Sequence, residues 1–180
     1  MFNRFDRWTK NGRWERVLEG LQTDRDNEWH SIDSTINRAH QHAAGGKGGA
    51  AEQGLGRSRG GLSTKVHLVV DALGLPITFE ITEGQRHDSR PANALVGTAQ
   101  SSCVLADKAY DSDSFRTALN VRGCLPVNPS NGSRAGKRAY DAPWKSLPSG
   151  CSAAAPKGDK ELYKARSEIE CTFNLLKQAR

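Results

Sequence analysis

Hydrophobic residues recur along this chain at two different spacings. Between residues 1 and 22 they recur three and four positions apart, which predicts a helix that Asn11-Gly12 breaks into two pieces. Helical spacing returns over 89–99, where Asp88 is a plausible N-cap, and over 113–121. Short apolar or alternating runs predict five strands, at 28–33, 64–71, 77–82, 103–106 and 124–127.

The last periodic stretch, residues 163–177, predicts one further helix with two different sides. At about 100° per residue, its polar strip falls within roughly 60° and consists of Tyr163, Arg166, Glu170 and Lys177. A neighbouring stripe predicts the buried face and consists of Leu162, Ile169, Phe173 and Leu176. A lone Glu on a helix is usually a solvated surface residue. The strip therefore indicates a functional site only in combination with residues earlier in the chain.

Two segments have no such period. Residues 43–61 are Gly-rich and basic, and we expect a loop that either tracks a nucleic-acid backbone or serves as a linker. Residues 128–159 are irregular, and we expect an insert. The order of elements predicts an α/β fold, a mixed five-stranded sheet flanked by helices. We expect a basic helical extension at 1–27 and one α/β domain at 28–180.

Charge adds a partner class to this picture. The 180 residues carry a net charge of +6, which suits a polyanion such as nucleic acid. No apolar run approaches the length of a membrane span, and the N-terminus lacks the apolar core of a signal peptide. The four cysteines show no zinc-site spacing. We therefore predict a cytoplasmic protein without a membrane partner.

Carboxylates supply the candidate chemistry. Asp33 and Asp107 each end a predicted strand, and sites in open sheets collect at strand ends. If those strands are neighbours, the last helix can bring Glu170 to the same point. Three carboxylates suit Mg²⁺ or Mn²⁺, and two such ions support in-line phosphoryl transfer. Competing interpretations are a His40/His42 metal pair, which we consider a surface feature, and Asp111 or Asp113 as a substitute ligand rather than a helix cap.

The final helix spells Y-x2-R-x3-E-x6-K, and the chain also contains IDSTINRAHQHAAG, GRSRGGLSTKVH and LADKAYDSD. These motifs resemble the DDE transposases of bacterial insertion sequences, in particular the second-frame product of two-frame elements. The resemblance runs from about residue 2 to 132 and resumes at 161. It implies an RNase H-like core and an enzyme that cuts DNA at the ends of an insertion sequence and joins them to target DNA.

The resemblance also implies roles for residues and partners. Asp33, Asp107 and Glu170 would form the catalytic triad that binds two Mg²⁺ or Mn²⁺ ions, and Tyr163, Arg166 and Lys177 would contact the DNA end. We add three expected DNA contacts, Arg57, Arg59 and Lys65. The implied partners are the terminal inverted repeats, target DNA, a helix-turn-helix product of an upstream frame, and a second copy in a homodimer.

Two departures from the family pattern keep other functions open. The insert at 128–159 and the end of the chain at Arg180, where family members usually continue, predict a truncated C-terminus. An inactive remnant that only binds DNA is therefore the main alternative. A nuclease of RNase H fold without a role in mobility is a third hypothesis.

Overall fold

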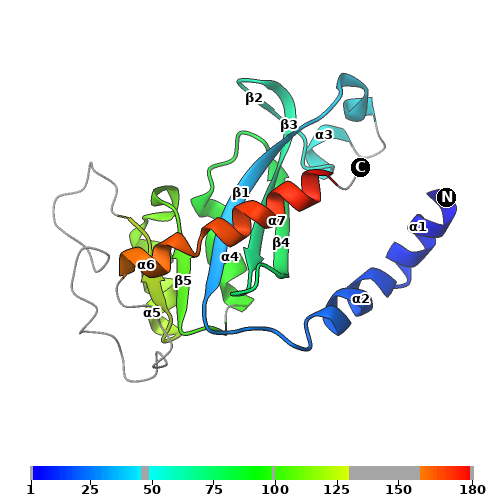
Figure 1. The fold of residues 1–180 in the computed structure, drawn as a ribbon. Coiled ribbons are helices and arrows are strands. Elements are labelled where there is room, and N and C mark those ends of the chain that lie inside the picture. The colour runs from blue at the N-terminus through cyan, green and yellow to red at the C-terminus, as the bar shows by residue number, and fades with distance from the viewer. Residues whose placement is uncertain (1, 46–48, 99, 130–158, 179–180) are drawn as a thin grey trace.

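A mixed sheet of six strands forms the centre of the computed structural model, which describes residues 2–45, 49–98, 100–129 and 159–178 (Figure 1). The strands are β1 (His30–Arg38), β2 (Gly56–Ser58), β3 (Gly61–Val70), β4 (Pro76–Glu83), β5 (Cys103–Ala106) and β6 (Leu125–Val127). Their order is β2-β3-β1-β5-β6, and β4 also pairs with β3. The β1–β3, β3–β4 and β2–β3 pairs are antiparallel, whereas β1–β5 and β5–β6 are parallel.

This arrangement confirms the predicted mixed sheet and adds one short strand. β2 lies in the Gly-rich segment that we expected to be a loop, where a 3-10 helix η1 (Gln41–Gly45) and a one-turn helix α3 (Gly49–Glu52) also form. β2 pairs with the first three residues of β3 through a turn at Arg59-Gly60. Gly61 has a φ of 98°, a conformation that glycine adopts without a steric penalty.

Helices cover both faces of the sheet (Figure 1). α4 (Ser89–Leu95), its 3-10 extension η2 (Val96–Thr98) and α5 (Asp113–Val121) pack on one face, where the largest apolar core lies. α7 (Ser167–Gln178) crosses the other face, and Ile169 and Phe173 pack there against Leu68 and Val70 of β3. α6 (Asp159–Lys164) places Leu162 against β5 and β6. The sheet is therefore buried where β1, β3 and β5 meet.

The predicted helix over 163–177 is in fact two helices. α6 ends at Lys164 and α7 begins at Ser167, and the amides of Ala165 and Arg166 bond three residues back in the turn between them. The single stripe of buried residues is therefore wrong at its last member. Leu162, Ile169 and Phe173 are buried in two separate clusters, whereas Leu176 is 51% exposed.

The N-terminal helices stand apart from the sheet (Figure 1). α1 (Phe2–Lys10) and α2 (Arg13–Leu21) are separated at Gly12, as the sequence predicted, and α2 has no buried residue. The side-chain Nε2 of Gln22 donates to the carbonyls of Pro76 and Ile77 at 3.1 and 2.6 Å, which ties the end of α2 to β4.

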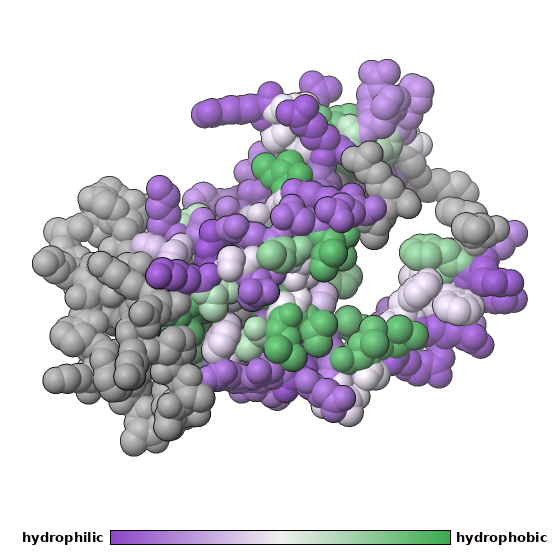
Figure 2. Space-filling view, in the orientation of Figure 1, coloured by the Kyte–Doolittle hydropathy of each residue, from purple (hydrophilic) through white to green (hydrophobic). Residues whose placement is uncertain are grey.

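An apolar groove of about 780 Å³ lies between α2, β4 and α7. Figure 2 shows apolar side chains gathered over β4 and α2 on this face of the molecule. None of the helices within the described ranges has the length and apolar character needed to cross a bilayer.

Candidate active site

Asp33 and Asp107 lie side by side because β1 and β5 are parallel neighbours. Ile32 pairs with Ala106 in the register of these strands, so the two aspartates occupy the next position on each chain. Asp107 directly follows β5, as predicted, and its Oδ1 accepts a hydrogen bond of 2.8 Å from the amide of Ala109. Asp33 lies in the middle of β1 and not at its end, because the strand continues to Arg38 along the long β3.

The environment of Asp33 favours its protonated form or a nearby cation. Burial is the main cause that raises the pKa of this carboxyl above its ordinary value, and the charge of Asp107 raises it further. The Ser34 amide, which donates to Asp33 Oδ1 at 2.8 Å, and the Arg166 guanidinium oppose the shift without cancelling it. Two half-buried carboxylates this close repel each other, and a cation between them relieves that repulsion.

Arg166 supplies the positive charge that the structure places next to Asp33. Its Nη1 donates to Asp33 Oδ2 at 2.8 Å, and its Nη2 donates to Glu170 Oε1 at 2.6 Å. The guanidinium also lies 5.8 Å from the centre of the Tyr163 ring, within the range of a cation–π contact. Arg166 reaches both carboxylates because it occupies the turn between α6 and α7.

The three predicted triad residues therefore meet only in part. Asp33 and Asp107 are direct neighbours, whereas Glu170 connects to Asp33 through Arg166 and its side chain is 54% exposed. Among the described residues, no group of three or more His, Cys, Asp or Glu side chains is arranged to hold a metal ion. The guanidinium stands where a cation shared by Asp33 and Glu170 would have to bind.

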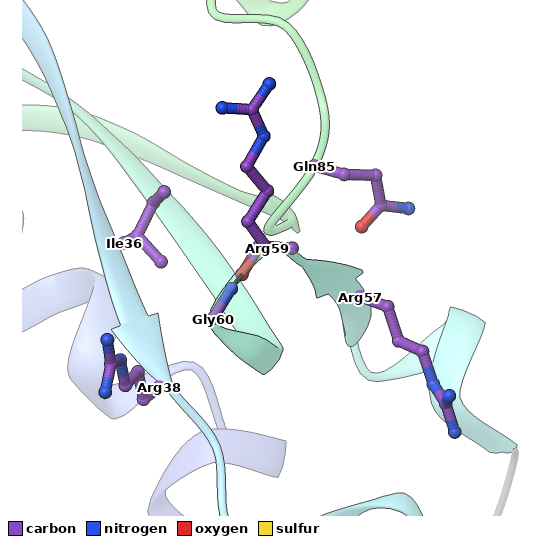
Figure 3. Close-up of a pocket in the computed structure, with 7 residues that line it drawn as sticks. Ile36, Arg38, Arg57, Arg59, Gly60 and Gln85 are labelled. Atoms are coloured by element: carbon purple, nitrogen blue, oxygen red, sulfur yellow. Dashed lines mark hydrogen bonds between the residues drawn. The ribbon is translucent and has the colours of Figure 1, made fainter.

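The predicted DNA contacts occupy different surfaces. Lys177 is exposed near the end of α7 and lines the apolar groove, seven residues or about 10 Å along the helix from Glu170. Arg57 and Arg59 line a second pocket, of about 640 Å³, together with Arg38 and Gln85. Figure 3 shows the three guanidinium groups pointing in different directions around this pocket. Such a spread suits a polyanion with spaced charges rather than one small anion.

Lys65 is the exception, and its predicted DNA contact needs correction. It lies within β3 with a side chain only 11% exposed, and its ammonium donates to Asp88 Oδ1 and to the Arg86 carbonyl, each at 2.8 Å. A lysine that pairs inside the fold does not offer its charge to DNA. The prediction took a basic residue beside a Gly-rich loop to be exposed. Strand alternation alone does not say which face of the sheet is covered by helices and loops.

Several other polar residues take roles that sequence reasoning weighed or missed. Asp111 is buried and pairs with Arg116 at 3.0 Å, so it supports α5. The rings of His40 and His42 contact each other on the surface. Ser34 and Asp88 were missed. Asp88 has the N-cap position of α4 but makes no capping bond with its side chain, which accepts a hydrogen bond of 2.8 Å from Ser34 Oγ.

A family model for the transposase DDE domain matches residues 30–180, which includes the whole sheet and all three candidate carboxylates. The chain belongs to the DDE transposase family. The RNase H-like fold that the resemblance implied agrees with this membership and with the strand order of the sheet. The matched range includes the Y-x2-R-x3-E-x6-K signature, which extends from α6 through the following turn into α7.

Relatives of this DDE transposase chain include a Brucella ovis protein named as a candidate transposase for insertion sequence element IS6501. The two are 36% identical over 124 residues, which cover 66% of this chain and 79% of the relative. An uncharacterized protein of Sinorhizobium fredii is 51% identical over 44 residues, 24% of this chain and 35% of its own length.

Solved structures of the Mos1 transposase are also similar. Its paired-end complex with the left transposon end gives 14% identity and a TM-score of 0.36, over 62% of this chain and 38% of that one. Its mariner paired-end complex with Mn gives 13% identity and a TM-score of 0.39, over 88% and 58%. The chain thus spans less than two thirds of the length of each of those transposase chains.

Proposed function

We propose that this chain carries the catalytic centre of an insertion-sequence transposase, which cuts DNA at the element ends and transfers the cut strand to target DNA. The observation that supports this most is the pairing of Asp33 and Asp107 on adjacent parallel strands, with Arg166 linking Glu170 to the same point. Family membership gives the reaction class. In this proposal the carboxylates bind the metal, and the basic side chains bind the DNA phosphates.

The carboxylates fit a hard divalent cation. All candidate ligands are oxygens, which Mg²⁺ and Mn²⁺ prefer, and the raised pKa of Asp33 reflects both burial and the charge of Asp107. Asp33, Asp107 and Glu170 would hold one or two ions once Arg166 withdraws from between Asp33 and Glu170. When bound, such ions activate the attacking oxygen and stabilise the leaving oxygen of phosphoryl transfer.

The remaining residues would bind and orient DNA. The Arg166 guanidinium pairs with two carboxylates in this structure. A phosphate of the DNA end would accept hydrogen bonds from the same two nitrogens. Lys177, farther along α7, would contact the same strand. Arg57 and Arg59 would contact the backbone at the far end of β1, since Arg38 beside them lies five residues or about 17 Å from Asp33. We propose the homodimer and the upstream-frame helix-turn-helix partner as further parts of the active complex.

Cleavage of a labelled duplex that carries the element end tests this function. With Mn²⁺ or Mg²⁺, we expect nicking at the end and joining to a second duplex. Asp107→Asn should lower the cleavage rate by at least about 100-fold, because a ligand position is lost, while DNA binding in a gel-shift assay is retained. Ser101→Ala, at the opposite end of β5, is the control and should cut normally.

Two results would replace the proposal with an alternative. Salt-sensitive DNA binding without cleavage under either metal would favour the inactive remnant. Cleavage without preference for the element end, and without strand joining, would favour a nuclease unrelated to mobility. Normal cleavage by Asp107→Asn would remove the assigned site.

A further inference from the structure

A carboxylate outside the proposed triad, that of Asp88, is bonded to the strand that carries Asp33. Its Oδ1 accepts hydrogen bonds from Ser34 Oγ and from Lys65 Nζ, each at 2.8 Å. The same lysine donates to the Arg86 carbonyl at 2.8 Å. Asp88 therefore joins the start of α4 to β1 and β3 at one atom.

The Asp88 side chain does not act as a helix cap. Asp88 occupies the N-cap position of α4, but its carboxylate bonds to side chains of the sheet and to none of the helix amides. Although burial raises the pKa of Asp88, its hydrogen bonds with Lys65 and Ser34 lower the pKa overall. The carboxylate is thus held charged, and it balances the nearly buried ammonium of Lys65.

Ser34 connects Asp88 to the candidate active site. Neighbouring side chains of a strand point to opposite faces, so Ser34 points toward α4 while Asp33 points toward α7. The Ser34 hydroxyl binds Asp88, and the Ser34 amide donates to Asp33 Oδ1 at 2.8 Å. One residue therefore holds Asp88 with its side chain and Asp33 with its backbone.

The buried ring of Tyr110 completes the surroundings. Its pKa is raised first by burial and then by the charges of Asp88 and Asp33, which both lie near the phenol. Tyr110 stays neutral, is almost fully buried and belongs to the main core. The link from Asp88 through Ser34 thus lies next to the buried core of the fold.

We propose that Asp88 is a positioning residue for the transposase reaction, which fixes Asp33 Oδ1 through Ser34 so that Oδ2 faces the metal position once Arg166 withdraws. The inference rests on the proposed function of Asp33. Residues that orient metal ligands typically change metal affinity or activity by about 10- to 100-fold when they are lost. Asp88 itself touches neither metal nor DNA in this scheme.

The test measures Mn²⁺ binding by electron paramagnetic resonance in the full chain without DNA, and the dependence of cleavage on Mn²⁺ concentration. Ser34→Ala removes the hydroxyl link but leaves the Asp88–Lys65 pair intact, so the protein should still fold. We expect its Mn²⁺ dissociation constant and its half-maximal Mn²⁺ concentration to rise about tenfold, with the KM for DNA unchanged.

Three further variants make the test specific. Ser34→Thr keeps the hydroxyl and should restore Mn²⁺ binding to within about twofold of the parent, because threonine suits a strand. Ser101→Ala removes a buried hydroxyl bond to the Cys103 carbonyl, at 2.8 Å, and should change neither quantity. Asp88→Asn should weaken Mn²⁺ binding, and adding Ser34→Ala to it should cause little further loss, because both act through one bond.

Parent-like Mn²⁺ binding by Ser34→Ala, or additive effects in the double variant, would overturn the positioning role. A loss of activity in proportion to the unfolded fraction alone, with the Mn²⁺ requirement unchanged, would also overturn it. Asp33→Asn separates this failure from that of the proposed function. If Asp33→Asn binds Mn²⁺ and cuts DNA like the parent, the site itself is wrong. If it loses both while Ser34→Ala is normal, only the positioning role fails.

Discussion

Removing the Arg166 guanidinium should destabilise the fold. At the same time, it should increase the stabilisation that a divalent metal ion gives to the protein. Arg166→Ala breaks two ion pairs, one with Asp33 at 2.8 Å and one with Glu170 at 2.6 Å. The two side chains of the first pair are only 20% and 19% exposed, whereas Glu170 is 54% exposed. The first pair should therefore carry most of the effect.

The magnitude follows from these exposures. A pair with about 4 Å between charge centres gains about 4 kcal/mol at an effective dielectric constant of about 20, before the costs of desolvation and ordering. Fully exposed pairs retain at most about 1 kcal/mol, and breaking a buried pair costs about 3–5 kcal/mol. For the half-buried Asp33 pair we expect about 2 kcal/mol, and for the i,i+4 pair with Glu170 about 0.4 kcal/mol. The variant should lose about 2–3 kcal/mol of unfolding free energy.

Urea unfolding, followed by circular dichroism at pH 7 with and without Mg²⁺, measures this. Mg²⁺ should stabilise Arg166→Ala more than the parent, because the ion need not displace a guanidinium to reach Asp33. Arg90→Ala changes an exposed arginine of α4 and should lie within about 0.5 kcal/mol of the parent. If Arg166→Ala unfolds like the parent, or if Mg²⁺ stabilises both proteins equally, the assignment of this guanidinium to the cation position is refuted.

Three further predictions concern DNA contact, pH and helix docking. Arg57→Ala combined with Arg59→Ala should reduce the slope of log affinity against log salt by about 2, measured by fluorescence anisotropy; an unchanged slope would remove both contacts. Burial lowers the pKa of His67 to about 4. As the pH falls, the unfolded chain therefore protonates this imidazole before the folded protein does, and the free energy of unfolding should decrease between about pH 6.5 and 4. Urea unfolding of His67→Gln should show less of this acid loss, and an equal loss would exclude His67 as a cause. Thr172→Val removes the 2.6 Å bond from α7 to the Gly74 carbonyl and should cost about 1 kcal/mol in urea unfolding. It should also slow cleavage, because Glu170 shares the helix; full activity would show that docking at this point is dispensable.

The fold was largely predictable because its signals are local. Strands rich in β-branched residues and the break at Gly12 each follow from a few neighbouring residues, and the structure shows both. The division of the last helix was not predictable from its period. Helical spacing on both sides of Ala165 continues through the turn, whereas the two helices pack in different clusters, Leu162 of α6 on β5 and β6 and Ile169 of α7 on β3.

The sequence proposes residues for the candidate site but not their contacts. Predicted strand ends and the family signature single out Asp33, Asp107 and Glu170 as candidates, whereas the partner of each carboxylate depends on which strands become neighbours. Lys65 and Asp88 show this limit, since they are 23 residues apart and pair only after β3 and α4 have packed. A cap motif and a basic residue look the same in sequence whether they face solvent or each other.

The parallel register of β1 and β5 makes the site unequally tolerant of insertions and deletions. Asp33 and Asp107 are neighbours because of backbone pairing, so a change of length between β6 and α6 leaves their relation intact. Glu170 depends on where α7 docks after that connection, through contacts such as Ile169 with the β3 side chains. In a mobile element that accumulates length changes, the aspartate pair should outlast the glutamate. Decayed copies should therefore keep a recognisable sheet long after the last carboxylate has lost its place.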